Sequence, residues 1–367
     1  MYNQTVATNF AADYPDCTII EGDVTLGNAV NFIGMEQVVE IQGVISCGGD
    51  GECNGSGGGP FENFLGLENV VSLGGLSLEE GGFSFDGLTS LEIITGSVNL
   101  DECYVSSFAD LTNLTQIMGD FDCQETEFED LIGLDNLGSV GGLFRIDETE
   151  TFLSSTGISS LTSIGGDFEI TDCNALQDFT SFSGLADVGG DFIIYDNTVV
   201  PNLDGFENLT SIGGSLTLRY NDMLANIEGI ANIDPATITF AEITNNLLLP
   251  QCAVASVCGH LLADGENLIE LNAEGCNSSD QVIEQCGANG ISDNGHAQFR
   301  LLSTVAQSEL LIYNPRNLEF VIWDSLGREV LRSRKSASIE VSHLSAGLFL
   351  VSIEQTEESL RFVKVQD

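Results

Sequence analysis

Apolar and polar residues alternate in short stretches that recur along most of the chain, each one just after a glycine. The clearest copies are LTSIGGDFEI at 161–170, LADVGGDFII at 185–194 and LTSIGGSLTL at 209–218. Alternation is the side-chain period of a β-strand, so each copy predicts one strand with two inward positions. A strand that recurs at a nearly fixed interval indicates a solenoid, in which every coil stacks on the one before it.

Ten copies align on the residue that opens the strand, from Gly22 to Ala236, and most are 21 to 24 residues apart. One interval is longer because it contains the glycine-rich insertion at 47–60. We therefore predict an all-β fold, a right-handed parallel β-solenoid of about ten coils over residues 1–246. The first inward column is Val24, Ile45, Leu76, Val98, Phe121, Phe144, Phe168, Phe192, Leu216 and Ile238. The second is Leu26, Cys47, Leu78, Leu100, Cys123, Ile146, Ile170, Ile194, Leu218 and Phe240.

The coil GLxNLTSIGGxLxI resembles the leucine-rich repeats of the receptor L-domain type, over roughly residues 18–246. Such repeats occur in receptor ectodomains, in fungal cell-wall proteins and in many secreted bacterial proteins. The chain departs from ordinary leucine-rich repeats because it lacks a strict asparagine column. Some asparagines do lie near that place in the last coils: Asn174, Asn197, Asn221 and Asn245. A straight, all-β coil is therefore favoured over a helical horseshoe.

A cysteine-rich segment at 247–290 is expected to cap the last coil, which would otherwise expose its apolar cross-section and a free strand edge. Two short helical patterns there contain four cysteines. Their spacing is consistent with Cys252–Cys276 and Cys258–Cys286 bridges, one of three possible pairings. A disulfide-bonded cap is preferred over metal binding or thiol catalysis.

The other cysteines lie in the repeats, and ten cysteines in all indicate an oxidising compartment. Cys103 and Cys123 lie in neighbouring coils, and we predict a bridge between them. Cys103 and Cys173 share a column but are three coils apart, about 14 Å, which is beyond disulfide reach. One cysteine near the first coils and Cys173 are expected to be unpaired. The pairing near the first coils stays open: Cys17, Cys47 and Cys53.

The pattern changes after a polar linker at 291–297, because residues 298–367 contain alternating strands typical of a small Ig-like β-sandwich. This tail resembles the C-terminal sorting domain of type IX secretion substrates in Bacteroidota. The resemblance implies recognition by the type IX secretion machinery and a secreted or outer-membrane cell-surface location. Residues that carry the resemblance are Leu326, Gly327, Arg328, Glu329, Val330, Ala346, Gly347 and Lys364.

Charge divides the chain into two parts. Residues before 296 contain 47 acidic and only two basic side chains, a net charge near −45, whereas the tail is nearly neutral. Such a field repels nucleic acid and anionic membranes and favours cations or basic partners. No apolar stretch reaches the length of a membrane helix, and residues 1–12 lack the pattern of a signal peptide, so any signal was removed or was never included.

Candidate chemistry is sparse. The three histidines, His260, His296 and His343, are not in the context of a catalytic nucleophile, and no catalytic residue is predicted. We predict a binding or adhesion module for a glycan or protein ligand. The alternative is an extracellular polysaccharide-acting enzyme that uses paired carboxylates on the solenoid face.

The predicted binding face is the outward side of the repeated strands. Equivalent residues of adjacent coils lie about 4.8 Å apart, so Asp167 and Asp191 should repel unless a cation lies between them. Calcium is therefore the candidate cofactor, and the alternative is that water and salt screen these charges. The candidate binding residues are Asp120, Asp122, Asp167, Glu169, Asp191 and Tyr195.

Overall fold

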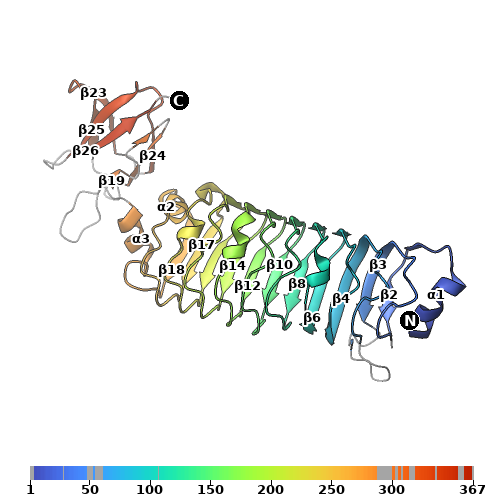
Figure 1. Ribbon diagram of the computed structural model, residues 1–367. Coiled ribbons are helices and arrows are strands. Elements are labelled where there is room, and N and C mark those ends of the chain that lie inside the picture. The colour runs from blue at the N-terminus through green and yellow to red at the C-terminus, as the bar shows by residue number, and fades with distance from the viewer. Residues whose placement is uncertain are drawn as a thin grey trace.

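Residues 4–27, 29–47, 53, 61–105 and 107–286 are described by the computed structural model, together with 300–301, 305–306, 309–313, 319–334, 337–353 and 359–365 in the tail. The first group forms a long solenoid of stacked coils and the second a small β domain (Figure 1). The predicted parallel β-solenoid is thus confirmed. The linker predicted at 291–297 lies outside the described residues.

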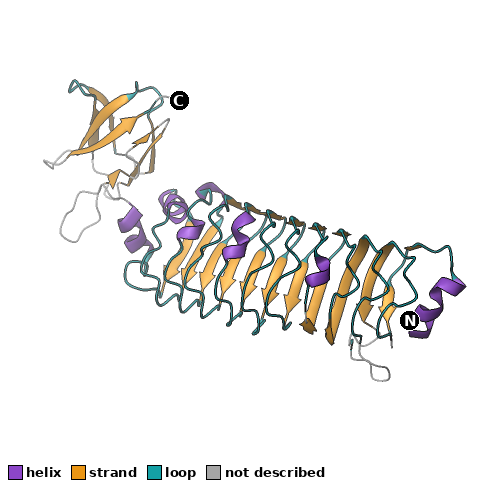
Figure 2. Ribbon diagram, in the orientation of Figure 1, coloured by secondary structure: helices purple, strands orange, loops and turns teal. Residues whose placement is uncertain are grey.

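The main sheet of the solenoid contains one strand from each coil, and all its neighbours pair in parallel. A single strand per coil at a fixed period leaves no other way to pair equivalent strands. Figure 2 shows these strands side by side along the solenoid. They are β2 (Val24–Leu26), β3 (Glu40–Cys47), β4 (Ser72–Phe83), β6 (Val98–Val105), β8 (Phe121–Gln124), β10 (Phe144–Asp147), β12 (Phe168–Thr171), β14 (Phe192–Tyr195), β16 (Leu216–Arg219), β17 (Phe240–Thr244) and β18 (Glu266–Glu270).

A second row of parallel strands precedes the main strands by a few residues. Most are two residues long, and the beginnings of β3 and β4 belong to the same row. A glycine turn at the corner ahead of this row explains part of the repeat. Gly157 has φ +106°, and a Cβ there would come within 2.1 Å of the Leu131 carbonyl oxygen of the coil before. The short strands are β1 (Ile19–Ile20), β5 (Ile93–Ile94), β7 (Gln116–Ile117), β9 (Ser139–Val140), β11 (Ser163–Ile164), β13 (Asp187–Val188) and β15 (Ser211–Ile212).

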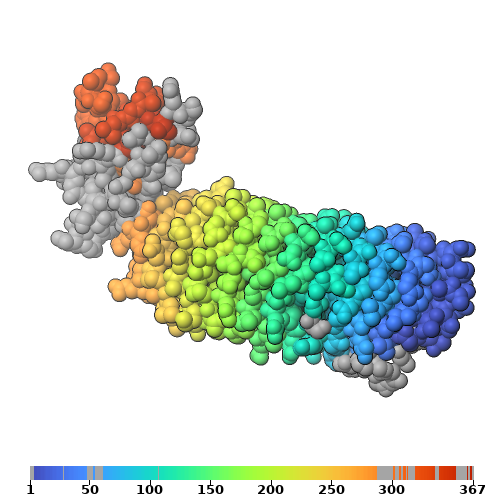
Figure 3. All heavy atoms as spheres, viewed as in Figure 1, coloured from blue at the N-terminus to red at the C-terminus, as the bar shows by residue number. Residues whose placement is uncertain are grey.

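The inward columns form the core. Phe121, Phe144, Phe168 and Phe192 stand opposite one another in successive strands, and their buried rings stack with centroids 5.1 to 5.8 Å apart. Offset stacking of this kind adds to the free energy gained by burying the rings. The space-filling view shows the coils packed into one continuous rod (Figure 3).

The predicted alignment of the last coil is wrong by three residues. Leu216 stands opposite Ala241 and not Ile238, and Leu218 stands opposite Ile243 and not Phe240. The cause is a 3₁₀ turn, η4 (Pro235–Thr237), whose N-cap Asp234 accepts a hydrogen bond from the Ala236 N–H. Similar turns occur in other coils: η1 (Ala109–Leu111), η2 (Thr180–Gly184) and η3 (Glu228–Ile230).

A buried polar column follows the main strands. In the later coils it consists of asparagines, each of which donates its side-chain amide to two backbone carbonyls and accepts a backbone N–H of the preceding coil. Asn174 and Asn245 stand outside this column. In the earlier coils threonine or cysteine takes the same place. The members are Cys103, Thr126, Thr149, Cys173, Asn197, Asn221, Asn246 and Asn272.

Helices cover both ends of the rod. At one end lies α1 (Gln4–Asp13), where the Gln4 side chain accepts the Val30 N–H at 3.0 Å. At the other lie α2 (Ala255–Leu262) and α3 (Ser279–Cys286), the two helices predicted for the cap, with β18 between them as a further strand of the main sheet.

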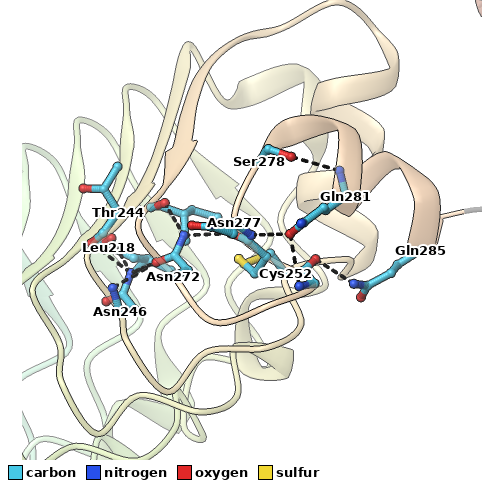
Figure 4. The surroundings of a disulfide bond; sticks show 12 residues. Leu218, Thr244, Asn246, Cys252, Asn272, Asn277, Ser278, Gln281 and Gln285 are labelled. Carbon is cyan, nitrogen blue, oxygen red and sulfur yellow. Dashed lines mark hydrogen bonds between the residues drawn. A yellow bond between two sulfur atoms is a disulfide. The ribbon is translucent and has the colours of Figure 1, made fainter. Parts of the chain in front are cut away.

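Two disulfides hold this cap, and both predicted pairings are confirmed. Cys252 bonds Cys276 and Cys258 bonds Cys286, with Cα atoms 5.4 and 5.5 Å apart. Beside the first bond, the Asn272 side chain donates to the Cys276 carbonyl at 2.9 Å and so joins the cap to the asparagine column (Figure 4).

The predicted bridge between Cys103 and Cys123 is wrong. A third disulfide joins Cys47 to Cys53, whereas Cys103 and Cys123 are free and buried. These two do not bond because the register places Cys123 opposite Leu100 and leaves Cys103 three residues further along its strand. Cys17 and Cys173 are also free, in agreement with the prediction that Cys173 and one cysteine near the first coils are unpaired.

The tail forms two small sheets around a separate apolar core, in agreement with the predicted sandwich. One sheet has the order β19-β21-β24 and the other β20-β26-β25-β22-β23; the described pairs are antiparallel except for β20 with β26. The strands are β19 (Arg300–Leu301), β20 (Val305–Ala306), β21 (Glu309–Tyr313), β22 (Phe320–Trp323), β23 (Glu329–Ser333), β24 (Ala337–Glu340), β25 (Gly347–Ile353) and β26 (Ser359–Lys364).

Candidate functional site

Three of the predicted binding carboxylates are hydrogen-bonded within the coil stack. Asp120 accepts the backbone N–H of Leu143 at 2.8 Å, Asp167 that of Asp191 at 2.7 Å, and Asp191 that of Ser215 at 2.6 Å. Each carboxylate therefore pairs a donor of the following coil, where the main strand begins. Aspartate at this place has a structural role that needs no ligand.

Asp122 and Glu169 lie on either side of Arg145, which stands between them in the register of β8, β10 and β12. The Arg145 Nε is 2.7 Å from Glu169 and its Nη1 is 3.5 Å from Asp122. Burial raises the pKa of Asp122, and the neighbouring Arg145 opposes this shift. A basic side chain of the chain itself thus balances two of the predicted carboxylates.

Metal binding at this face finds no preformed cluster. Within the described part of the chain, no three His, Cys, Asp or Glu side chains are grouped so that they could hold a metal ion. Stabilisation of the solenoid by calcium stays a prediction.

Tyr195, the last predicted residue, belongs to a cluster on the outward side of β14, β16 and β17. Its ring meets that of Tyr220 edge to face, with centroids 5.7 Å apart. The Arg219 guanidinium carbon lies 4.8 Å from the centre of the Tyr220 ring and 6.0 Å from that of Tyr195. Glu242 stands beside it, with Oε1 3.5 Å from the Arg219 Nη1. We call Tyr195, Arg219, Tyr220 and Glu242 the Tyr–Arg cluster.

The local sequence explains how the Tyr–Arg cluster forms. Tyr195 stands directly opposite Arg219 in the parallel register, and Thr217 opposite Glu242. Tyr220 follows β16 in a left-handed turn, at φ 58°, and so its backbone turns away from the strand directly after Arg219. Sequence reasoning missed Arg219, Tyr220 and Glu242 as site residues. Their signal was LRY at 218–220, where the preceding coils from Glu80 to Asp196 have an acidic residue in place of the tyrosine.

That turn position is a column of its own. It is left-handed in successive coils, with φ between 47° and 59°. The pKa of Glu125 is raised by its neighbours Glu148 and Glu102, and burial together with Asp196 raises the pKa of Asp172 to about 6. The column, which the sequence analysis did not identify, is Glu80, Glu102, Glu125, Glu148, Asp172, Asp196, Tyr220, Asn245 and Leu271.

Two hollows lie along this acidic edge. One, of about 570 Å³, includes Tyr104, Glu127, Glu129 and Ile132 in its wall. The other, of about 440 Å³, is lined by Glu125, Glu127, Glu148, Glu150, Asp172 and Asn174. Among the described residues that line them, none is basic, so neither hollow pairs its carboxylates with a cation of the chain.

The tail brings its motif residues together at two places. The turn between β22 and β23 contains Gly327 at φ 74°, and it is closed by Asp324, whose carboxylate accepts the backbone N–H groups of Leu326 and Arg328. Hydrogen bonds from the Arg328 backbone lower the pKa of Asp324. At the second place, Gly347 of β25 stands opposite Lys364 of β26.

Residues 306–365 match the family model of the secretion system C-terminal sorting domain. The chain carries a type IX sorting domain. This confirms the resemblance noted in the tail, and the match covers almost all of the two small sheets. The likeness of the coils to receptor L-domain repeats stays a prediction.

The sorting domain places the protein outside the cell or on its surface, exported by the type IX machinery that recognises such domains. The oxidised cysteines of the cap agree with this location. No helix in the described residues is long and apolar enough to cross a membrane. A search of curated proteins found none similar to this chain.

Proposed function

We propose that the solenoid is an extracellular binding module for a glycan, and that it binds through the Tyr–Arg cluster. The observation that supports this most is the presence of two partly exposed tyrosines around a guanidinium on the outward face of the main sheet. The C–H groups of a sugar ring pack against the negative face of an aromatic ring, and polar groups at its edge fix the orientation.

A glycan suits this surface better than a folded protein. A stable protein–protein interface buries about 1,200 to 2,000 Å², with aromatic anchors at its centre. Among the outward residues of the neighbouring coils, the carboxylates Asp167 and Asp191 are already engaged within the stack, and Glu169 is paired by Arg145. A single sugar unit needs only the Tyr–Arg cluster.

The test is binding of the intact protein to a panel of immobilised polysaccharides. Tyr195→Ala removes one ring, and Tyr220→Asn removes the other while keeping a residue that tolerates positive φ, as Asn245 does in the next coil. We expect each variant to bind at least tenfold more weakly than the wild type, about 1.4 kcal/mol. Tyr14→Ala, which removes an exposed tyrosine near α1, is the control and should bind normally.

Retention of no polysaccharide, or equal binding by wild type and both cluster variants, would contradict the proposal. Release of new reducing ends from the bound polysaccharide would favour the enzyme alternative, which requires turnover and not binding alone.

A further inference from the structure

The Arg219 guanidinium has hydrogen-bonding capacity that the protein does not use. A guanidinium carries five N–H donors. Nη2 donates to the Tyr220 hydroxyl at 3.4 Å and Nη1 lies 3.5 Å from Glu242, both at the long limit of a hydrogen bond. Nε is buried without a partner in the described part of the chain, while the side chain as a whole is 39% exposed. The buried Nε is out of reach of a ligand, but Nη1 and Nη2 carry two N–H groups each and make only these long contacts. An incoming acceptor can therefore bind the Nη groups of Arg219.

Glu242 supplies the complementary acceptor next to it. Its Oε1 accepts the Thr244 hydroxyl at 3.3 Å, and a carboxylate has room for about four hydrogen bonds. The Tyr–Arg cluster thus presents donors and acceptors side by side, with aromatic rings beside them. A sugar hydroxyl can both donate and accept, so two adjacent hydroxyls match this pair, one facing Arg219 and the other Glu242.

An acidic sugar could also pair with an arginine, but the negative charge around Arg219 disfavours it. Its carboxylate would lie close to Glu242, which is 3.5 Å from the guanidinium. The chain before residue 296 contains 47 acidic side chains against two basic ones. At physiological ionic strength, salt largely screens charges that lie more than about 8 Å from the ligand. Glu242 lies closer than that, so its repulsion is screened much less. A neutral ligand meets none of this repulsion.

We infer that the Tyr–Arg cluster selects neutral sugar units that present two adjacent free hydroxyls, and disfavours acidic sugars. This inference rests on the proposed function and adds the class of ligand. Arg219 and Glu242 determine specificity, and the two tyrosines provide the stacking surface.

The experiment compares hexasaccharides that differ in one feature, by calorimetric titration of the intact protein. Cellohexaose and β-1,4-mannohexaose have free adjacent hydroxyls at C2 and C3, whereas the internal units of β-1,3-linked laminarihexaose have none. The fourth probe is cellohexaose with its C6 hydroxyls oxidised to carboxylates. We expect laminarihexaose to bind at least tenfold more weakly than the better β-1,4 probe. The oxidised probe should bind at least tenfold more weakly than cellohexaose in 50 mM NaCl, and this gap should narrow in 500 mM NaCl.

Glu242→Gln tests the role of the charge, because its expected effect on the oxidised probe would not follow if Glu242 were only structural. It keeps one acceptor oxygen and removes the charge, so it should strengthen binding of the oxidised probe several-fold. The neutral probes lose a charge-assisted hydrogen bond from a sugar hydroxyl and should bind several-fold more weakly, so the two classes of probe respond in opposite directions. Arg219→Lys should weaken the neutral probes, because it loses the planar fork of donors.

Two results distinguish a failure of the inference from a failure of the proposed function. Tighter binding of the oxidised probe, or of laminarihexaose, would overturn the inference and leave glycan binding standing. Failure of every hexasaccharide to bind would overturn the proposed function and the inference together.

Discussion

The asparagine column makes Asn221 a position where a single substitution should strongly destabilise the solenoid. Its side chain is fully buried. The amide donates to the Ile194 carbonyl at 2.9 Å and to the Arg219 carbonyl at 3.2 Å, and the oxygen accepts the Asn197 N–H at 3.0 Å. The amide also donates to the Asn246 side-chain oxygen at 3.3 Å, which keeps the Asn221 backbone N–H as a second donor. Asn221→Leu has a similar size and removes all four side-chain hydrogen bonds, and three groups then lose their partner.

The expected cost follows from the groups left behind. A buried donor or acceptor that loses its partner costs about 1 to 3 kcal/mol. Three such groups remain after Asn221→Leu, and carbonyls tolerate the loss better than an N–H because their other lone pair can stay engaged. We therefore expect the free energy of unfolding to fall by about 3 to 6 kcal/mol.

The chain itself provides the matched control. Thr126 occupies the same column, and its single O–H lies within reach of two carbonyls, those of Leu100 at 3.1 Å and Gln124 at 2.9 Å. Asn221→Thr should therefore retain part of the network and lose only about 1 to 3 kcal/mol.

Urea unfolding followed by circular dichroism measures both variants, and hydrogen exchange reports on the Asn197 amide directly. That amide should exchange faster in Asn221→Leu than in the wild type. A loss below about 1 kcal/mol, or an unchanged exchange rate at Asn197, would show that the column is not held by these hydrogen bonds.

Two further predictions concern titrating groups. Burial raises the pKa of the Cys103 thiol to about 11 and that of the Cys173 thiol to about 12. A thiol reagent should therefore label only Cys17 in the native protein and all four free cysteines after denaturation. Labelling of more than one cysteine in the native protein would contradict the burial of these thiols. The pKa of Asp172, about 6, lies above its ordinary value of 3.8, so its ionisation costs stability as pH rises through this range. Asp172→Asn should raise Tm more at pH 8 than at pH 4, and an equal shift at both would refute this.

The alternation of apolar residues was enough to predict the core. Phe168 and Phe192 occupy equivalent inward places, and the register between β12 and β14 pairs them directly. The alignment failed in the last coil because Asp234 and Pro235 begin a turn that displaces the strand by three residues. The repeat pattern alone does not show where such a local turn shifts a strand.

The candidate site was harder to predict because it depends on contacts between coils. Asp191 was predicted on the outward side of a strand, but it lies directly before β14 and accepts the N–H of Ser215 in the following coil. Cys103 and Cys123 lie in neighbouring coils, yet a bridge also requires the same position along the strand. Tyr220 was missed because its place in a left-handed turn follows from the backbone and not from the alternation.

The left-handed column separates what the fold requires from what the surface adds. A positive φ is least costly for glycine and is tolerated by asparagine, so Asn245 suits this position better than a glutamate. Stacked carboxylates add mutual repulsion, which raises the pKa of Glu125. The fold therefore needs a left-handed residue here, but it does not need an acidic one. Among the described turn positions the carboxylates stop after Asp196, and Tyr220 of the Tyr–Arg cluster comes next, so the proposed site for a neutral ligand begins where the acidic column ends.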